Sequence, residues 1–235
     1  MTRAGQRCIS DFAMAPRKHN LISYSVALLV FVSVIVVRFR NTGDGMSSLP
    51  SLSMPAKLGV VMWCYHFARR TAEAAWVHRY GKARVPLGDV LIEYLYYWGF
   101  AALIAGSLTP DVHAAWVSWL GVLGVAVFVV AERGNARAHR MLRELRPAGS
   151  TERVIPRGFW FERVSSPHYL FEILSWVGFA MTTQTWAACA FLVVGAGILG
   201  SWARARHAAY HKQFDGRGGR EAYPASRRAL IPGVF

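Results

Sequence analysis

Residues 21–37 read LISYSVALLVFVSVIVV, an apolar run that contains no charged side chain. An α-helix needs about 20 residues of this kind to cross the hydrocarbon core of a bilayer. Runs of similar length and largely apolar character occupy residues 87–108, 114–131 and 185–202. The four runs predict transmembrane helices, and with them an all-α, polytopic membrane protein.

Two further segments, 56–77 and 167–183, are largely apolar but carry ionisable side chains. These are His66, Arg69, Arg70 and Glu73 in the first segment, and His168 and Glu172 in the second. Ionisable groups inside an apolar span usually face the interior of a helix bundle or a water-filled cavity. Both segments are therefore predicted to be membrane-embedded, which gives six spans, with seven as the alternative.

Composition and charge agree with a membrane protein. Hydrophobic residues make up 54% of the 235 residues and charged residues only 17%, which is too apolar for an ordinary soluble domain. The formal net charge of +14 would also suit a nucleic-acid partner, but the basic residues lie between and after the spans. The positive-inside rule expects them there, so no nucleic acid is predicted to bind.

The same rule predicts the topology. If residues 1–20 form a cytosolic N-terminal segment, six spans place 78–86, 132–165 and 203–235 on the cytosolic side, and all three are rich in Arg or Lys. Three basic residues of the first opposite loop run against the rule: Arg38, Arg40 and Lys57. Both termini are predicted to be cytosolic, and residues 21–235 to form a single membrane-embedded domain.

Several common kinds of binding site are excluded because the sequence lacks their motifs. Cys8, Cys64 and Cys189 are odd in number and scattered, so neither a disulfide framework nor a metal site is predicted. No glycine-rich phosphate loop follows a strand pattern, which excludes a Rossmann domain. Any dinucleotide would have to be held by the helices and loops of a membrane protein.

One candidate site is a polar, cationic helix face that begins in residues 132–146. In this segment the face consists of Asn135, His139, Arg143 and Arg146, which follow one another at steps of four, four and three residues. Its members on the helix that continues the last span are Arg206, His207 and Tyr210. Arg holds phosphate groups through a bidentate fork, so this set is a candidate for binding a dinucleotide cofactor. The alternative is a basic loop beside anionic lipid.

A second candidate is Pro167-His168-Tyr169, with Glu172 one helical turn later. A phenol or imidazole at membrane depth can donate a proton, and a carboxylate there can orient a polar group of a substrate or cofactor. Tyr169, His168 and Glu172 are therefore the candidate catalytic residues. The alternative is an interfacial tyrosine beside a locally satisfied pair of His168 and Glu172.

Polar and aromatic residues of the second and third predicted spans form a third candidate. Charges within apolar spans indicate a polar cavity that reaches into the membrane, which would suit a substrate. The proposed substrate-binding residues are His66, Arg69, Glu93, Tyr96 and Tyr97. The equal alternative is that Arg69 and Glu73 pair across one turn and only close a helix end.

Four stretches of the sequence carry a family resemblance. They are EYLYYWGFAALI (93–104), GNARAHRMLRELRPAGSTERVIP (134–156), SSPHYLFEILSWVGFAMTTQ (165–184) and the ending from SWARARHAAYHKQF (201–214) to RRALIPGVF (227–235). In order and spacing they resemble the very-long-chain trans-2-enoyl-CoA reductases of the steroid 5α-reductase superfamily. The resemblance covers nearly three-quarters of the chain, from about residue 62 onward.

This resemblance implies an all-helical reductase of the endoplasmic reticulum membrane. Its expected reaction is the NADPH-dependent reduction of trans-2-enoyl-CoA, the last step of fatty-acid elongation. Expected partners are the long-chain enoyl-CoA substrate, membrane lipid and other enzymes of the elongation cycle. Reduction of a steroid or polyprenol double bond is the main alternative. A methyltransferase of the isoprenylcysteine type and a non-catalytic scaffold are the remaining ones.

The resemblance also implies roles for individual residues. The positions that match the family's cofactor contacts are Asn135, Arg146, Glu172, His207 and Tyr210. Tyr169 is the candidate proton donor, and its phenol needs a nearby Arg or protonated His to release a proton easily. His168 stands where the family usually has Asn, and the extra DGRGG loop at 215–219 is expected to loosen the tail that covers the cofactor.

Overall fold

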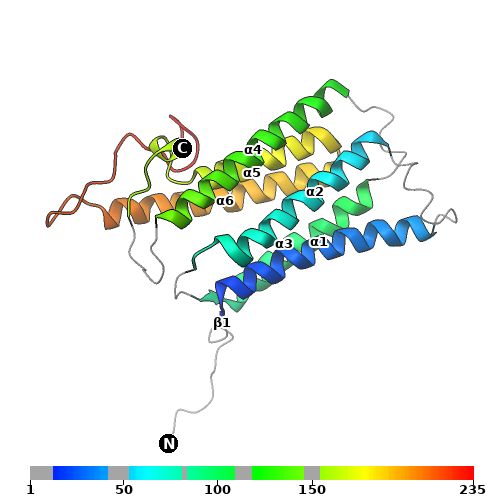
Figure 1. Ribbon diagram of the computed structural model, residues 1–235, viewed down its shortest axis with the longest axis horizontal. Coiled ribbons are helices and arrows are strands. Elements are labelled where there is room, and N and C mark those ends of the chain that lie inside the picture. Colours follow the sequence, from blue (N-terminus) through cyan, green and yellow to red (C-terminus); the bar gives the residue numbers. More distant parts are fainter. Residues whose placement is uncertain (1–12, 42–52, 81–83, 109–117, 146–153) are drawn as a thin grey trace, which may run out of the picture. The chain divides into compact units, whose positions relative to one another are not determined.

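Helices dominate the computed structural model, which describes residues 13–41, 53–80, 84–108, 118–145 and 154–235 (Figure 1). The chain divides into two compact units between residues 110 and 111, and each unit is described by itself. The first unit consists of β1 (Ala13–Met14), α1 (Pro16–Asn41), α2 (Met54–Ala72), the π-helix η3 (Glu73–Val77), β2 (Val85–Pro86) and α3 (Leu87–Ser107). The second consists of α4 (Ser118–Glu144), the 3₁₀ turn η5 (Phe159–Glu162), α5 (Pro167–Thr183) and α6 (Trp186–Gln213).

Aromatic side chains form the core of the first unit. The ring of Phe31 on α1 stacks on that of Trp63 on α2, with centroids 5.0 Å apart. Phe67 lies 4.6 Å from Trp63, 6.3 Å from Tyr24 and 5.6 Å from Tyr97 of α3. Rings from all three helices thus meet in one cluster, and offset or edge-on ring pairs of this kind stabilise a packed interior.

The helix α5 forms the centre of the second unit, since it packs against both α4 and α6 (Figure 1). Its bounds follow from the local sequence. Pro167 suits the first turn of a helix, where its missing N–H is not needed. At the other end Gln184 adopts a left-handed conformation with φ of 49°, and the Thr185 hydroxyl accepts from the Ala188 N–H to begin α6.

Glycines bring α4 and α5 into unusually close contact. A Cβ atom added at Gly124 of α4 would lie 2.6 Å from the carbonyl oxygen of Gly178 and from the Thr182 hydroxyl on α5. One added at Gly178 would lie 2.6 Å from the Gly124 oxygen and the Phe128 nitrogen. Further along α4, Gly134 leaves room for the ring of Phe171 in the same way. The two backbones touch because no side chain separates them.

The C-terminal tail folds back onto the segment that precedes α5. Val164 and Arg228 form a parallel bridge, with the Ser165 N–H donating to the Arg228 oxygen at 2.8 Å. The guanidinium of Arg227 is buried and donates to the Pro156 oxygen at 2.7 Å and to Glu162 at 2.9 Å. The Gly158 N–H, and after it Arg227, lower the pKa of the Glu162 carboxyl below its ordinary value.

The loop of residues 215–222 closes at its base. Asp215 and Ala222 form an antiparallel bridge, and the Tyr223 N–H donates to the Phe214 oxygen at 2.8 Å. Tyr223 therefore continues directly from the end of α6, and the loop does not lengthen the path from the helix to the tail.

The predicted all-α membrane fold is confirmed. Among the described residues, four helices, α1, α3, α4 and α6, are long and apolar enough to cross a membrane. The predicted bounds 167–183 are those of α5, and the polar helix expected after the fourth span is the continuation of α4 to Glu144. The segment 56–77 is an α-helix only as far as Ala72 and then a π-helix. The count of six spans and the single membrane-embedded domain stay predictions.

The close packing of α4 on α5 can be tested by adding one methyl group. Gly124→Ala would press a Cβ against the backbone of Gly178, which cannot rotate away, so the helices must separate. Overpacking of this kind costs about 1–3 kcal/mol. We expect a lower thermal unfolding temperature for the purified protein in detergent.

Gly197→Ala on α6 is the matched control, because an added Cβ there meets nothing within 4 Å. The same methyl group in open space should leave stability unchanged or raise it by up to about 1 kcal/mol, through the better helix propensity of alanine. Equal unfolding temperatures for the two variants would contradict the close contact.

Candidate active site

A buried amide on α4 links two points on α5. The side-chain nitrogen of Asn135 donates to the backbone oxygen of His168 at 2.8 Å and to the Glu172 carboxylate at 2.9 Å. All three residues are buried, Asn135 completely. The ring of His139, one turn after Asn135, lies 5.4 Å from that of His168. Four of the predicted site residues therefore meet where α4 crosses the start of α5.

Tyr169 lies beside this centre and has a cation next to its phenol. Arg206 of α6 donates to the Tyr169 hydroxyl at 3.2 Å, and its guanidinium carbon is 5.2 Å from the centroid of the Tyr169 ring. The rings of His168 and Tyr169 are 4.1 Å apart. The guanidinium and the phenol are thus in direct contact through both the hydroxyl and the ring face. A cation beside the Tyr169 phenol is expected from the sequence, and the residue in that place is Arg206.

Three side chains connect the segment just before α5 to α6 and to the tail by short hydrogen bonds. The Ser165 hydroxyl lies 2.6 Å from Nδ1 of His207 and 2.7 Å from the hydroxyl of Tyr223. Tyr223 also stacks on Tyr210, with ring centroids 5.1 Å apart and planes nearly parallel. His207 and Tyr210 are both predicted to contact a cofactor. Near the end of α6, His207 is held by the Ser165 hydroxyl and Tyr210 by the ring of Tyr223.

The hydroxyl of Ser166 is fully buried and has no hydrogen-bond partner among the described residues. Ser166 is the N-cap of α5, yet its side chain makes no cap hydrogen bond. The N-terminus of a helix carries partial positive charge and favours an anion or a polar ligand atom. An unused buried hydroxyl at this end suits a polar ligand group such as an amide or a phosphate.

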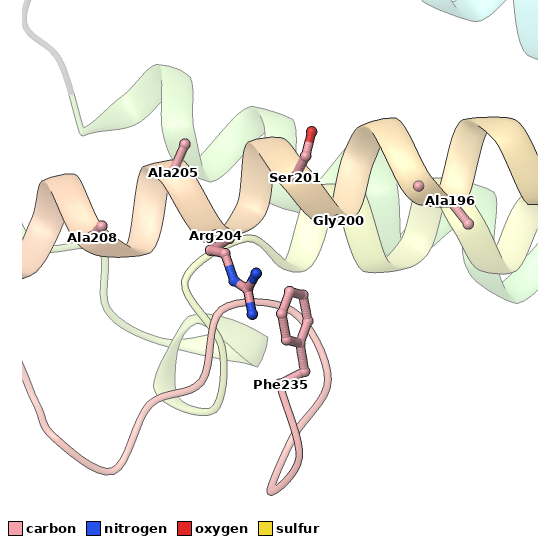
Figure 2. A pocket seen from close by; sticks show the side chains of 8 residues that line it. Ala196, Gly200, Ser201, Arg204, Ala205, Ala208 and Phe235 are labelled. Carbon is pink, nitrogen blue, oxygen red and sulfur yellow. The ribbon is translucent and has the colours of Figure 1, made fainter.

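A hollow of about 520 Å³ lies along α6 on the side of Arg204 and the terminal Phe235 (Figure 2). Small residues such as Gly200 and Ala205 are among those that line it, and the Arg204 guanidinium carbon is 5.2 Å from the centroid of the Phe235 ring. None of the predicted site residues lines it. The hollow is therefore separate from the centre around Asn135 and Glu172.

One of the predicted phosphate-binding residues is not part of this centre. Arg143 is exposed in the last turn of α4. Arg146 lies outside the described residues, and its role stays a prediction.

The predicted substrate-binding residues belong to the first unit and largely bind one another or their neighbours. Arg69 and Arg70 both pair with Glu73, Arg70 at 2.7 Å. Glu93 accepts from Ser23 at 3.1 Å and lies 3.0 Å from the His19 imidazole. The remaining predicted members are aromatic neighbours, with ring pairs Tyr96–Tyr97, Tyr96–Phe100 and His66–Phe67. The pair of Arg69 and Glu73 foreseen as the alternative is present, and a substrate cavity here stays a prediction.

Sequence reasoning missed Ser165, Ser166, Tyr223 and Arg227. Two serines directly before Pro167 are a recognisable helix-start pattern, and that pattern would have drawn attention to their hydroxyls. Nothing local marks Arg227 as buried, because its partners lie far away in the sequence.

Membrane-length helices around a buried set of amide, carboxylate, imidazole and phenol groups define a helical membrane protein with an enzyme-like polar centre. The family model for 3-oxo-5-alpha-steroid 4-dehydrogenase matches residues 83–235, and the chain belongs to this family. The match includes the whole second unit and α3 of the first.

Several known proteins are similar to the chain. The very-long-chain enoyl-CoA reductase of Dictyostelium discoideum is 37% identical over 203 residues, which are 86% of this chain and 65% of that protein. The probable very-long-chain enoyl-CoA reductase of Caenorhabditis elegans is 33% identical, over 81% of this chain and 63% of that protein. The steroid 5-alpha-reductase DET2 of Arabidopsis thaliana is 38% identical over 51% of this chain and 44% of that protein. The chain thus spans somewhat less than two thirds of the two enoyl-CoA reductases.

The hydrogen bond between Asn135 and Glu172 can be tested by reversing its direction. Asn135→Asp would put a second carboxylate 2.9 Å from Glu172 and remove the donor to the His168 oxygen. We expect a loss of roughly 1–3 kcal/mol in stability, measured as a lower unfolding temperature.

Adding Glu172→Gln to that variant restores a donor and an acceptor in exchanged positions, so part of the lost stability should return. The hydrogen bond to His168 stays lost, so recovery is incomplete. If the double variant is no more stable than Asn135→Asp, the two side chains do not interact as described.

Proposed function

We propose that the chain reduces the 2,3 double bond of a trans-2-enoyl-CoA with NADPH, to give the saturated acyl-CoA at the last step of fatty-acid elongation. The observation that carries the proposal is the phenol of Tyr169, held by Arg206 beside the buried Asn135 and Glu172. Relatives named very-long-chain enoyl-CoA reductase support the choice of substrate. The endoplasmic reticulum membrane, with both termini cytosolic, is the proposed location.

The residues of the second unit suit a nicotinamide dinucleotide. The unused Ser166 hydroxyl and the N-terminus of α5 offer donors to an amide or phosphate, and Arg206 and His207 offer further donors. His139, Arg143 and Arg146 add basic groups on and after α4, which favours NADPH over NADH because NADPH carries one more phosphate. When bound, NADPH would supply a hydride to the β-carbon of the substrate.

Tyr169 supplies the proton in this proposal. Its O–H bond breaks as a new C–H bond forms at the α-carbon, and Arg206, which donates to this hydroxyl, holds the oxygen in position. Water on the cytosolic side then returns a proton to the phenolate. Asn135 fixes the Glu172 carboxylate, which orients a polar group of the cofactor. His168 packs against Tyr169 and holds its ring in place.

For the substrate, His66, Arg69, Glu93, Tyr96 and Tyr97 remain the proposed contacts. Arg69 and Glu93 already have partners within the first unit, whereas Tyr96 and Tyr97 present aromatic surface that suits an acyl chain. Membrane lipid and other enzymes of the elongation cycle are the further proposed partners.

The substrate class is tested by incubating the purified protein with NADPH and trans-2-hexadecenoyl-CoA while following absorbance at 340 nm, the band that is lost on oxidation of NADPH. We expect turnover with this thioester and lower catalytic efficiency when NADH replaces NADPH. A steroid enone and a polyprenol serve as comparison substrates, because steroid reductases are also among the relatives. Faster turnover of either comparison substrate would favour that alternative function.

The role of Tyr169 is tested with Tyr169→Phe, which removes one hydroxyl and preserves packing. General acid catalysis is worth about 10²–10⁴-fold, so kcat should fall at least ~100-fold while the Kd for NADPH stays nearly constant. Tyr65→Phe on α2 makes the same chemical change at a half-exposed tyrosine outside the proposed site and should keep parental activity. A kcat for Tyr169→Phe within a few-fold of the parent would remove this phenol as the proton donor.

A further inference from the structure

The contact among Tyr223, Ser165 and His207 allows only one arrangement of hydrogens that leaves every group satisfied. The Ser165 hydroxyl has a single hydrogen and two neighbours, at 2.6 Å and 2.7 Å. Among the described residues the Tyr223 hydroxyl has no hydrogen-bond partner other than the Ser165 hydroxyl, and the Tyr223 side chain is buried. If Ser165 donated to Tyr223, the phenolic hydrogen would be left without an acceptor in the protein interior, which is costly.

Tyr223 therefore donates to Ser165, which agrees with the greater acidity of a phenol. Among the residues that the structure describes, Ser165 in turn has only Nδ1 of His207 to receive its hydrogen. Nδ1 is then an acceptor, and a neutral imidazole with an accepting Nδ1 carries its proton on Nε2. Hydrogen bonds arranged head to tail in this way also strengthen one another.

We infer that Ser165 and Tyr223 are positioning residues that hold His207 as a neutral imidazole with a donating Nε2–H, directed to an oxygen of the bound dinucleotide. The tail residue Tyr223 thus acts on the cofactor through two other side chains without touching it. The ligand part of this inference rests on the proposed function, whereas the proton assignment belongs to the protein alone.

The anchoring of the three residues supports a positioning role. The Ser165 backbone is fixed to the tail through its N–H and the Arg228 oxygen at 2.8 Å. Tyr223 is fixed by its N–H to the Phe214 oxygen at 2.8 Å and by stacking on Tyr210. The His207 ring packs edge-on against His211 and Tyr223, with centroids 4.6 Å and 5.9 Å away. The imidazole of His207 is therefore held by Ser165, His211 and Tyr223.

The proton assignment is tested on the ligand-free protein by nuclear magnetic resonance of ¹⁵N-labelled histidine, with His207 identified by the signal lost in His207→Gln. We expect Nδ1 to show the shift of an accepting nitrogen and Nε2 that of a protonated one. In Ser165→Ala this pattern should change, and in Ser165→Thr, which keeps the hydroxyl, it should persist. A proton found on Nδ1 in the parent overturns the inference.

The effect on the cofactor is tested by the Kd for NADPH, measured by its fluorescence. Ser165→Ala and Tyr223→Phe should each raise Kd roughly three- to tenfold, with kcat at saturating NADPH little changed. Because both act through His207, neither should raise Kd further in a His207→Ala background. Tyr223→Phe retains the stacked ring, so it serves as the informative variant if Ser165→Ala fails to fold.

The outcomes separate this inference from the proposed function. Increases in Kd that persist undiminished without His207 would show a general structural role and overturn the relay, while the reductase function stands. A parent protein with the expected proton pattern that binds no NADPH would overturn the proposed cofactor and the ligand part of the inference.

Discussion

The direct contact of α4 and α5 at Gly124 and Gly178 is the constraint on which the second unit depends. A Cβ added at either glycine would lie 2.6 Å from the backbone of the other helix, so any larger residue there would push the two helices apart. The amide of Asn135 reaches both a carbonyl and a carboxylate on α5 only because the helices lie this close. A separation of even 1 Å would lengthen both hydrogen bonds beyond their useful range. Backbone packing in the apolar half of the helices thus sets the geometry of the polar half.

A second set of contacts brings the tail to the same region. The bridge of Val164 with Arg228 and the buried guanidinium of Arg227 bind the chain's last residues to the segment just before α5. Ser165 therefore has the tail on one side and α6 on the other, and the start of α5 is built from three parts of the chain that are distant in sequence. We therefore expect changes in the tail to alter the position of the first residues of α5, which contribute to the polar centre.

Much of the fold could be predicted because the residues at the ends of each helix, together with its apolar run, determine where the helix begins and ends. Pro167 begins α5 and the polar Thr183-Gln184-Thr185 ends it, so the bounds 167–183 follow from local sequence. The individual polar residues Asn135, Glu172 and Tyr169 also stand out in an apolar setting. Their partners could not be predicted, since the pairing of Asn135 with Glu172 joins positions 37 residues apart and depends on helix register. The pairing of Arg206 with Tyr169 likewise depends on how α5 and α6 pack.

The closed base of the loop at 215–222 has a consequence for how this protein can vary. Gly216, Gly218 and Gly219 adopt positive φ, and Asp215 pairs with Arg220 at 3.0 Å, so the loop folds on itself. The hydrogen bond from Tyr223 to Phe214 returns the chain to its starting point. Residues can then be gained or lost at the tip without shifting the register of anything downstream. Such a position is free to diverge between lineages, and it would accept an inserted epitope or fluorophore a short distance from the stacked tyrosines.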